Sequence, residues 1–490
     1  MKPANTFKEG VCLQMKGMVS QDICWMSASD LAAAIKAKKL SPVEAVKALL
    51  KRIEAINPKI NAYVTITTDS AMAAAKKAEA AVMKGEELGP LHGVPVSIKD
   101  VMYTKGVRTT MGSRLMEDFV PEEDSVCVAR LKKAGAIMLG KTNTPEFAAS
   151  GVTENSVFGI TRNPWNLGRT PGGSSGGAAA AVAAGLGPMA TGSDSGGSIR
   201  IPACCCGVFG IKPQFGRVPI YPFSRLCDSL NHEGPITRTV RDAALMLDVM
   251  AGAHWGDRLS LPRPRTSFVN SLRGGMKGFK VAWSLDLGYA TVSRQVQTIC
   301  EDAVKTFSEM GAEVEPIHLD LRNAEGIYFA ISDTELRARL SLFGPPDEIK
   351  DKLHPKLAEH LAQSKDLTAN DYLKTQFDRQ EVAARIGKVF ETYDLLLTPT
   401  LSVPAWPIGL PKVYPEEVDG KPVSIGGWLH TYPFDLTGQP AASTPAGWTE
   451  DGLPVGLQIV GRHFDEFTVF RAAAAFERAK PWAHRKPPLG

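Results

Sequence analysis

The chain has 490 residues, of which 44% are hydrophobic and 22% charged, the composition of an ordinary globular protein. Its 56 lysines and arginines against 52 aspartates and glutamates leave a formal charge of +4, which gives no indication of nucleic acid or of an anionic membrane as a partner. Eight cysteines are too few for a disulfide scaffold, and the three consecutive ones at 204–206 cannot all face one metal ion, so we expect reduced thiols and no metal site.

The N-terminal segment and the apolar runs bear on where the protein acts. Residues 1–17 carry scattered charges and no apolar core, so we expect no secretory signal. The alanine-rich run at 178–186 is bounded by glycines and is much shorter than the roughly 18 apolar residues that a membrane-spanning helix needs. The expectation is a cytoplasmic enzyme that contacts neither a membrane nor nucleic acid.

Three helices are predicted in a helical region over residues 27–90. Asp30 can cap a helix over 31–38, and the segment 41–44, Ser-Pro-Val-Glu, combines an N-cap, a proline at the first helical position and the glutamate of a capping box. Apolar residues then recur at three- and four-residue steps, which indicates one buried helix face. A third, alanine-rich helix is expected over 70–84. These helices are predicted to be scaffold.

A buried strand is predicted within residues 91–101, and it ends on Lys99 followed by Asp100. A lysine at the end of a strand most often extends its amine to the surface. The alternative is a desolvated amine that serves as a base. The strand alone leaves both interpretations open, and for Asp100 we expect a structural hydrogen bond rather than a chemical role.

Residues 135–142 match the phosphate-loop pattern G-x-x-x-x-G-K-[ST] letter for letter. A phosphate loop needs a strand before its first glycine, a flexible turn between the glycines and a helix after the last residue. Here a predicted helix at 125–134 precedes the segment, four strand-forming residues fill the turn, and Pro145 follows. The context therefore argues against nucleotide binding, and 136–139 is predicted as a strand.

Strands and helices alternate from about residue 60 to the end, and no linker rich in proline, serine or like charges interrupts them. Further strands are predicted at 280–283, 395–397 and 454–460, and further helices at 237–252, 294–310 and 466–478. The pattern predicts an α/β fold with one large, mixed, twisted sheet covered by helices on both faces, and a single domain over 1–490. Residues 320–392 are polar and helical and are predicted as an excursion near a substrate pocket.

Two serine-bearing glycine segments flank the alanine-rich run. The first, 172–177, has the composition of a flexible linker, but it lies between Asn-Pro-Trp at 163–165 and a predicted helix, so we interpret its glycines as positions that need unusual backbone angles. The second, 194–198, could place a nucleophile beside backbone N–H groups that stabilise an oxyanion, as acyl transfer requires. Ser198 is the natural nucleophile in that arrangement.

A nucleophilic serine needs a base within hydrogen-bond reach, and the usual base is histidine. None of the nine histidines lies in a recognisable nucleophile–base pattern, and the Gly-x-Ser-x-Gly turn of α/β-hydrolases is absent around Ser198. A Ser-His-Asp hydrolase is therefore disfavoured.

Three segments together resemble the amidase signature family: Ile-Lys-Asp at 98–100, Pro-Gly-Gly-Ser-Ser-Gly-Gly at 171–177, and the eleven residues 192–202. Their spacing is also similar, with 75 residues from Lys99 to Ser174 and 24 from Ser174 to Ser198. Shorter stretches resemble family segments as far as residue 458. The resemblance thus covers nearly the whole chain.

The resemblance implies a Ser-Ser-Lys triad in the amidase signature fold. Ser198 would be the nucleophile, Ser174 a bridging serine that follows a cis peptide bond, and Lys99 the base. The implied oxyanion hole consists of the backbone N–H groups of Ser195, Gly196, Gly197 and Ser198. Asp194 and Arg200 resemble a structural pair that holds this loop, and no cofactor or metal is implied.

The expected substrates are small, apolar or aryl amides that react with water, and esters and carbamates are further candidates, as for an aryl acylamidase or a urethanase. We expect a monomer or a homodimer. Candidate pocket residues are Ser150, Gly151, Tyr221 and Phe223, and the aromatic residues Trp428 and Tyr432 are either pocket walls or ordinary core.

The alternative function is that of the amidase-type chain in a glutamine-dependent tRNA amidotransferase. That branch of the family carries a Gly-Phe-Gly and a Lys-Arg-Arg-Ile segment in its C-terminal third. This chain has Phe-Gly-Pro-Pro at 343–346 and no such basic segment over 354–379. The difference favours a free-standing amidase.

Overall fold

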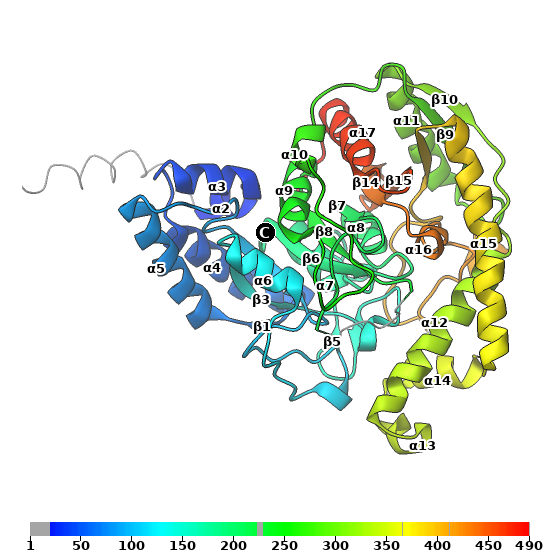
Figure 1. The fold of residues 1–490 in the computed structure, drawn as a ribbon, viewed down its shortest axis with the longest axis horizontal. Coiled ribbons are helices and arrows are strands. Elements are labelled where there is room, and N and C mark those ends of the chain that lie inside the picture. Colours follow the sequence, from blue (N-terminus) through cyan, green and yellow to red (C-terminus); the bar gives the residue numbers. More distant parts are fainter. Residues whose placement is uncertain (1–19, 223–228, 365, 411, 490) are drawn as a thin grey trace, which may run out of the picture.

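The computed structural model describes residues 20–222, 229–364, 366–410 and 412–489, and its centre is one mixed sheet of 11 strands (Figure 1). From edge to edge the strands are β1 (Tyr63–Ile66), β3 (Ile137–Thr142), β2 (Pro95–Lys99), β6 (Met189–Asp194), β8 (His232–Thr237), β7 (Phe209–Lys212), β14 (Ala441–Trp448), β15 (Pro454–Gly461), β11 (Leu395–Pro399), β9 (Lys280–Trp283) and β10 (Glu313–Pro316). β2 is parallel to β3 and β6, whereas β6, β8, β7, β14 and β15 pair antiparallel in that order. The predicted mixed α/β sheet is confirmed.

Helices cover both faces of this sheet. On one face α7 (Gly176–Ala183) packs against α8 (Arg200–Cys206), and every residue of both helices is buried. The other face is covered by a connected layer of helices: α6 (Val126–Lys133), α9 (Val240–Met250), α10 (Phe268–Ser271), α11 (Arg294–Glu309) and α17 (Glu466–Ala479). Phe307 of α11 stacks on Phe476 of α17 with ring centroids 5.3 Å apart, which joins two of these helices.

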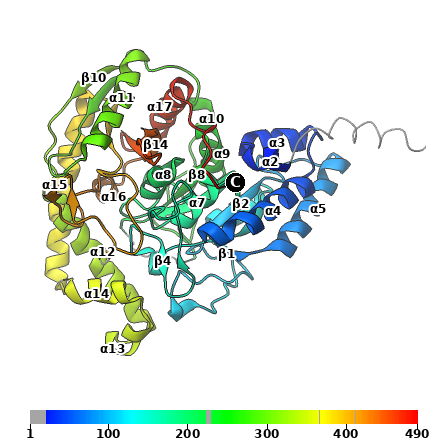
Figure 2. The ribbon, with the colours of Figure 1, turned by 180° about the vertical axis from the view of Figure 1, so that it is seen from behind.

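The N-terminal helices lie at one end of the molecule (Figures 1 and 2). They are α2 (Ser20–Trp25), α3 (Ala28–Lys36), α4 (Pro42–Ile60) and α5 (Thr68–Lys84). The capping box predicted at the start of α4 is present, with Ser41 as the N-cap and Glu44 as its partner. The predicted cap of α3 is wrong, because Ser27 is the N-cap and its hydroxyl accepts the N–H of Asp30 inside the first turn.

The region 320–392 lies at the opposite end of the molecule (Figures 1 and 2). It contains α12 (Ala324–Leu340), α13 (Pro346–Ile349), α14 (Pro355–Gln363) and α15 (Ala369–Thr392), and its described residues form no strand. α12 and α15 both contact α16 (Pro433–Thr437). Helices thus make up most of this region.

The segment that matches the phosphate-loop pattern is a strand. Ile137–Thr142 forms β3, between β1 and β2, so no phosphate-binding turn exists there. The buried Lys141 amine donates to the Met102 carbonyl and, at 3.0 Å, to the Thr109 hydroxyl. Asp100 accepts the N–H and hydroxyl of Thr110 at 3.0 and 2.6 Å, which is the structural role predicted for it.

Two short hairpins, β4–β5 (Glu154–Asn155, Gly159–Ile160) and β12–β13 (Glu417–Val418, Lys421–Pro422), complete the strands of the described chain. Across the residues that are described, no helix combines the length and apolar character needed to cross a lipid bilayer.

Candidate active site

Lys99 ends β2 and is wholly buried, so its amine does not reach the surface. The amine donates to the hydroxyl of Ser174 at 2.6 Å and to that of Ser193 at 2.8 Å. Burial lowers the pKa of Lys99 to about 7, although the carboxylates of Asp194 and Glu233 oppose this shift. The amine can therefore lose its proton near neutral pH while two hydroxyls hold it in place.

Ser174 lies in the loop that leads into α7, and the peptide bond between Gly173 and Ser174 is cis. A Cβ atom on Gly173 would lie 2.8 Å from the backbone of residues 150–152, so a larger residue does not fit there. The N–H of Ser175 donates to the carbonyl of Ser198 at 3.1 Å. This hydrogen bond fastens the first glycine segment to the second.

Ser198 lies in the turn between β6 and α8 and is partly exposed, whereas Lys99 and Ser174 are wholly buried. Gly197 has a φ of 128°, and a Cβ atom there would lie 2.2 Å from Thr431 Oγ1. The Thr431 hydroxyl donates to the carbonyl of Gly196 at 2.6 Å. The turn thus requires glycine at position 197. Among the three candidate catalytic residues, Ser198 is the one that a substrate can approach.

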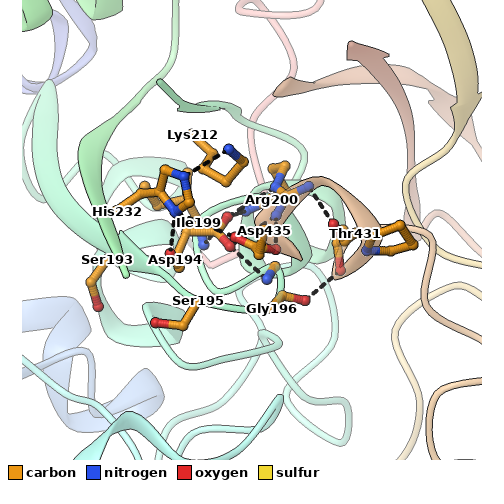
Figure 3. A network of polar contacts seen from close by, with 12 residues as sticks. Ser193, Asp194, Ser195, Gly196, Ile199, Arg200, Lys212, His232, Thr431 and Asp435 are labelled. Carbon is orange, nitrogen blue, oxygen red and sulfur yellow. Dashed lines mark hydrogen bonds and ion pairs between the residues drawn. The ribbon is translucent and has the colours of Figure 1, made fainter. Parts of the chain in front are cut away.

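A buried ion pair between Asp194 and Arg200 holds this turn (Figure 3). Arg200 Nη2 and Nε lie 2.9 and 3.0 Å from the two carboxylate oxygens of Asp194. Asp194 also accepts the N–H groups of Gly197 at 2.5 Å and Ile199 at 3.1 Å. Burial alone would raise the pKa of Asp194, but the charge and hydrogen bond of Arg200 together with the nearby Lys212 and His232 outweigh it and hold the pKa below its ordinary range. The ionised carboxylate therefore anchors the turn that carries Ser198.

The contact with Asp194 changes the predicted oxyanion hole, because the N–H of Gly197 is already donated. The other three predicted donors are the N–H groups of Ser195, Gly196 and Ser198. Within the described part of the chain, none of these three N–H groups is hydrogen-bonded to an acceptor. His232 Nδ1 donates to the carbonyl of Asp194 at 3.1 Å. Since the C=O and N–H of a trans peptide point in opposite directions, this bond aims the Ser195 N–H away from His232.

Three further ionisable residues surround the ion pair, and the sequence analysis did not identify them (Figure 3). Asp435 of α16 accepts from Arg200 Nη2 at 2.5 Å, and His232 Nδ1 lies 3.5 Å from Asp435 Oδ1. Lys212 Nζ lies 3.1 Å from His232 Nε2. Burial lowers the pKa of Lys212 to about 7 and that of His232 well below its ordinary value. These residues come from β7, β8 and α16, so no local pattern could have grouped them.

Two of the predicted pocket residues, Ser150 and Gly151, border the cis peptide bond. The Ser150 hydroxyl and the Gly151 N–H each lie 3.1 Å from the phenol oxygen of Tyr414. The Tyr414 ring packs on Trp428 with centroids 5.5 Å apart, and Trp428 is wholly buried. Trp428 therefore supports this segment from the core.

Tyr221, another predicted pocket residue, packs with two other aromatic rings. Its ring packs on His254 and Trp255 with centroid distances of 5.3 and 5.2 Å, and Trp255 is 84% exposed. No contact joins Tyr221 to the three candidate catalytic residues within the described chain. Phe223 lies outside the described residues.

Tyr328 lies against the turn of Ser198, and the sequence analysis missed it. A Cβ atom on Gly196 would lie 2.1 Å from the phenol oxygen of Tyr328, which is partly exposed on α12. The Tyr328 ring packs on Tyr432 with centroids 5.3 Å apart, and Tyr432 is wholly buried. The excursion 320–392 thus reaches the candidate site through Tyr328, which no sequence motif marked.

No group of three His, Cys, Asp or Glu side chains is arranged to hold a metal ion within the ranges that the structure describes. The cysteines that the structure describes, including the three at 204–206, form no disulfide with one another and are buried.

The family model named Amidase matches residues 44–470. An acylamidase of Rhodococcus erythropolis is 40% identical over 96% of this chain and 98% of its own length. The A-type chain of a glutamyl-tRNA(Gln) amidotransferase from Geobacter metallireducens is 38% identical over 92% of this chain and 96% of its own. Among solved structures, a bacterial aryl acylamidase of the amidase signature family has a TM-score of 0.86 at 33% identity, covering 94% of this chain and 97% of its own. The chain belongs to the amidase signature family and is an amide hydrolase.

Proposed function

We propose that the protein hydrolyses small amides through an acyl-enzyme, with Ser198 as the nucleophile, Ser174 as the relay and Lys99 as the base. The observation that carries the proposal is the hydrogen bond of 2.6 Å between the buried Lys99 amine and the Ser174 hydroxyl. A buried amine whose pKa is about 7 can accept a proton at neutral pH, which an ordinary lysine cannot do.

The proposed relay moves one proton in each direction. Ser198 Oγ attacks the amide carbonyl and gives its proton to Ser174, which passes its own proton to the neutral Lys99 amine. The proton returns along the same path to the leaving amine as the C–N bond breaks. Water then attacks the acyl ester of Ser198 with the same assistance, which releases the acid and restores the free serine.

The oxyanion that forms during attack would be bound by backbone N–H groups of the Ser198 turn. The N–H groups of Ser195, Gly196 and Ser198 are the proposed donors, because that of Gly197 is bonded to Asp194. Loss of one donor from such a site costs on the order of a hundredfold or more in rate. The proposed role of the Asp194–Arg200 pair is to keep these donors in position.

For the substrate we propose an apolar or aryl amide, with esters and carbamates as related candidates. Tyr328 supports this choice, because its partly exposed ring lies beside Gly196 of the proposed oxyanion hole. The names of two relatives, an acylamidase and an aryl acylamidase, support it as well. The proposed enzyme works in the cytoplasm without a cofactor, as a monomer or homodimer.

The second candidate is the amidase-type chain of a glutamine-dependent tRNA amidotransferase. Several relatives named for that role are 36–39% identical to this chain, close to the value for the acylamidase. An amidotransferase chain of this kind would need a partner chain to act. Hydrolysis of 4-nitroacetanilide by the chain purified alone supports the free-standing amidase, whereas glutamine hydrolysis that requires a partner supports the alternative.

The triad is tested by Lys99→Ala, Ser174→Ala and Ser198→Ala variants assayed on the same anilide. Each should lose activity by about a hundredfold or more while it keeps a native thermal transition. Ser97→Ala is the matched control, because Ser97 is a buried serine on the same strand, two residues before Lys99. Full activity in a folded Lys99→Ala or Ser198→Ala variant would overturn the proposed mechanism.

A further inference from the structure

Two neighbouring residues of β8, His232 and Glu233, point to opposite faces of the sheet. β8 pairs antiparallel with β6, so that His232 lies opposite Asp194 and Glu233 lies opposite Ser193. His232 belongs to the cluster around Arg200, whereas the Ser193 hydroxyl points away from that cluster (Figure 3). Because side chains alternate along a strand, the Glu233 side chain lies on the face of Ser193.

The Lys99 amine reaches this pair of residues at the Ser193 hydroxyl. Lys99 Nζ lies 2.8 Å from Ser193 Oγ, and residues directly opposite in an antiparallel pair have Cβ atoms about 4.5–5.5 Å apart. Lys99, Ser193 and Glu233 therefore form a row across the adjacent strands β2, β6 and β8. All three are buried, with exposed fractions of 0%, 4% and 2%.

The helices packed around this row add one titratable group. Burial and then Glu233 raise the pKa of the Cys127 thiol on α6, and α7 consists of glycine, alanine and valine alone. Asp194 also acts on Lys99, but its side chain lies on the other face, where it is paired with Arg200.

The second lysine of this region, Lys141 on β3, faces other groups. Its amine is bonded to the Met102 carbonyl and lies 4.0 Å from Asp100. Its charge acts on Asp100 and on Cys127. Glu233 is thus the carboxylate opposite Ser193, whose hydroxyl the amine of the proposed base contacts.

We propose that Glu233 is a positioning residue for Lys99, whose carboxylate stabilises the ammonium form of the amine across Ser193 and so sets the lowest pH at which the amine acts as a base. The inference rests on the proposed function. A buried negative charge favours a nearby positive one, and Glu233 raises the pKa of Lys99 against the larger, opposite effect of burial. Without this carboxylate the amine would be neutral at lower pH and would take the proton of Ser174 less readily.

The test is the pH dependence of kcat/KM for 4-nitroacetanilide, a substrate with no charge to titrate. Glu233→Gln should move the acid limb to lower pH by about one unit, whereas Glu233→Asp should keep it near the wild-type position. Glu477→Gln is the matched control, because Glu477 is partly buried on α17, accepts the Val240 N–H and does not act on Lys99. An acid limb of Glu233→Gln that coincides with those of Glu477→Gln and the wild type would overturn the inference.

A second substitution keeps the test decisive if Glu233→Gln does not fold. Glu233→Met fills a similar volume without a charge, and the same shift to lower pH is expected. Failure of the proposed function gives a different result: a folded Ser198→Ala variant would then keep its activity, whatever the acid limbs of the Glu233 variants show.

Discussion

The Lys99 amine and the Ser174 hydroxyl lie 2.6 Å apart, and both side chains are completely shielded from solvent. β2 supplies the lysine and the loop before α7 supplies the serine. Burial lowers the pKa of the amine to about 7, and in the proposed relay the short distance lets the neutral amine accept the proton of Ser174.

The first prediction concerns pH. The base must be neutral to accept a proton, and burial lowers the pKa of Lys99 to about 7. The kcat/KM of the wild type for an uncharged anilide should therefore rise with pH through about 7 and become constant above it. A rate that stays constant from pH 5.5 to 8.5 would contradict this assignment of the base.

The second prediction concerns stability, with Lys99→Met as the probe. An unfolded lysine has a pKa near 10.4, so between pH 7 and about 10 the unfolded state binds one more proton than the folded state at this position. The wild type should gain about 1.4 kcal/mol of unfolding free energy per pH unit relative to Lys99→Met across this window. Urea unfolding at pH 7.5 and 9.5 measures it, and a difference independent of pH would show that Lys99 keeps an ordinary pKa.

The third prediction concerns the contact between α12 and the Ser198 turn. In Gly196→Ala the new methyl group would lie 2.1 Å from the phenol oxygen of Tyr328, so the turn or the tyrosine must move. We expect kcat/KM to fall on the order of a hundredfold, because displacement of about 1 Å at a reacting centre has that effect. The double variant Gly196→Ala/Tyr328→Ala should recover part of the loss.

Gly326→Ala is the control for this substitution. Gly326 also lies on α12, but a Cβ atom there meets nothing within 4 Å. It should leave kcat/KM unchanged. Equal activity of the two alanine variants would mean that the contact with Tyr328 does not constrain the turn.

The fourth prediction concerns the buried cluster in Figure 3. Arg200→Met leaves Asp194 and Asp435 buried without their shared cation, and removal of one partner of a buried pair typically costs about 3–5 kcal/mol. Chemical unfolding should show this loss. Arg322→Met, which removes an exposed pair with Asp320, should leave the unfolding midpoint unchanged. Similar midpoints for the two variants would show that the cluster does not stabilise the fold.

The sequence could predict strands with a continuous apolar run and helices with clear caps. Lys280–Trp283 has the predicted bounds, and Ser41 caps α4 as expected. The strands β6, Met189–Asp194, and β8, His232–Thr237, were not predicted, because their sequences mix glycine, proline and polar residues. Every residue of both is buried, and neighbouring strands and covering helices impose that burial without any local pattern.

The candidate site was predictable only where a motif marks it. The spacing of Lys99, Ser174 and Ser198 indicated three residues of one family pattern. Lys212 of β7 joins the cluster around Arg200 and Tyr328 of α12 lies against the Ser198 turn, and nothing in their local sequence distinguishes them from a core lysine or a packing tyrosine. The sequence also could not show that the N–H of Gly197 donates to Asp194 rather than to an oxyanion, because this hydrogen bond forms only in the folded turn.

Trapping of the acyl-enzyme tests the central proposal most directly. The wild type is mixed with an activated aryl ester, quenched in acid within the steady state, and digested for peptide mapping by mass spectrometry. The account predicts one added acyl group on Ser198, and none in Ser198→Ala under the same conditions. An acyl group on any other residue, or turnover by Ser198→Ala at the wild-type rate, would contradict it.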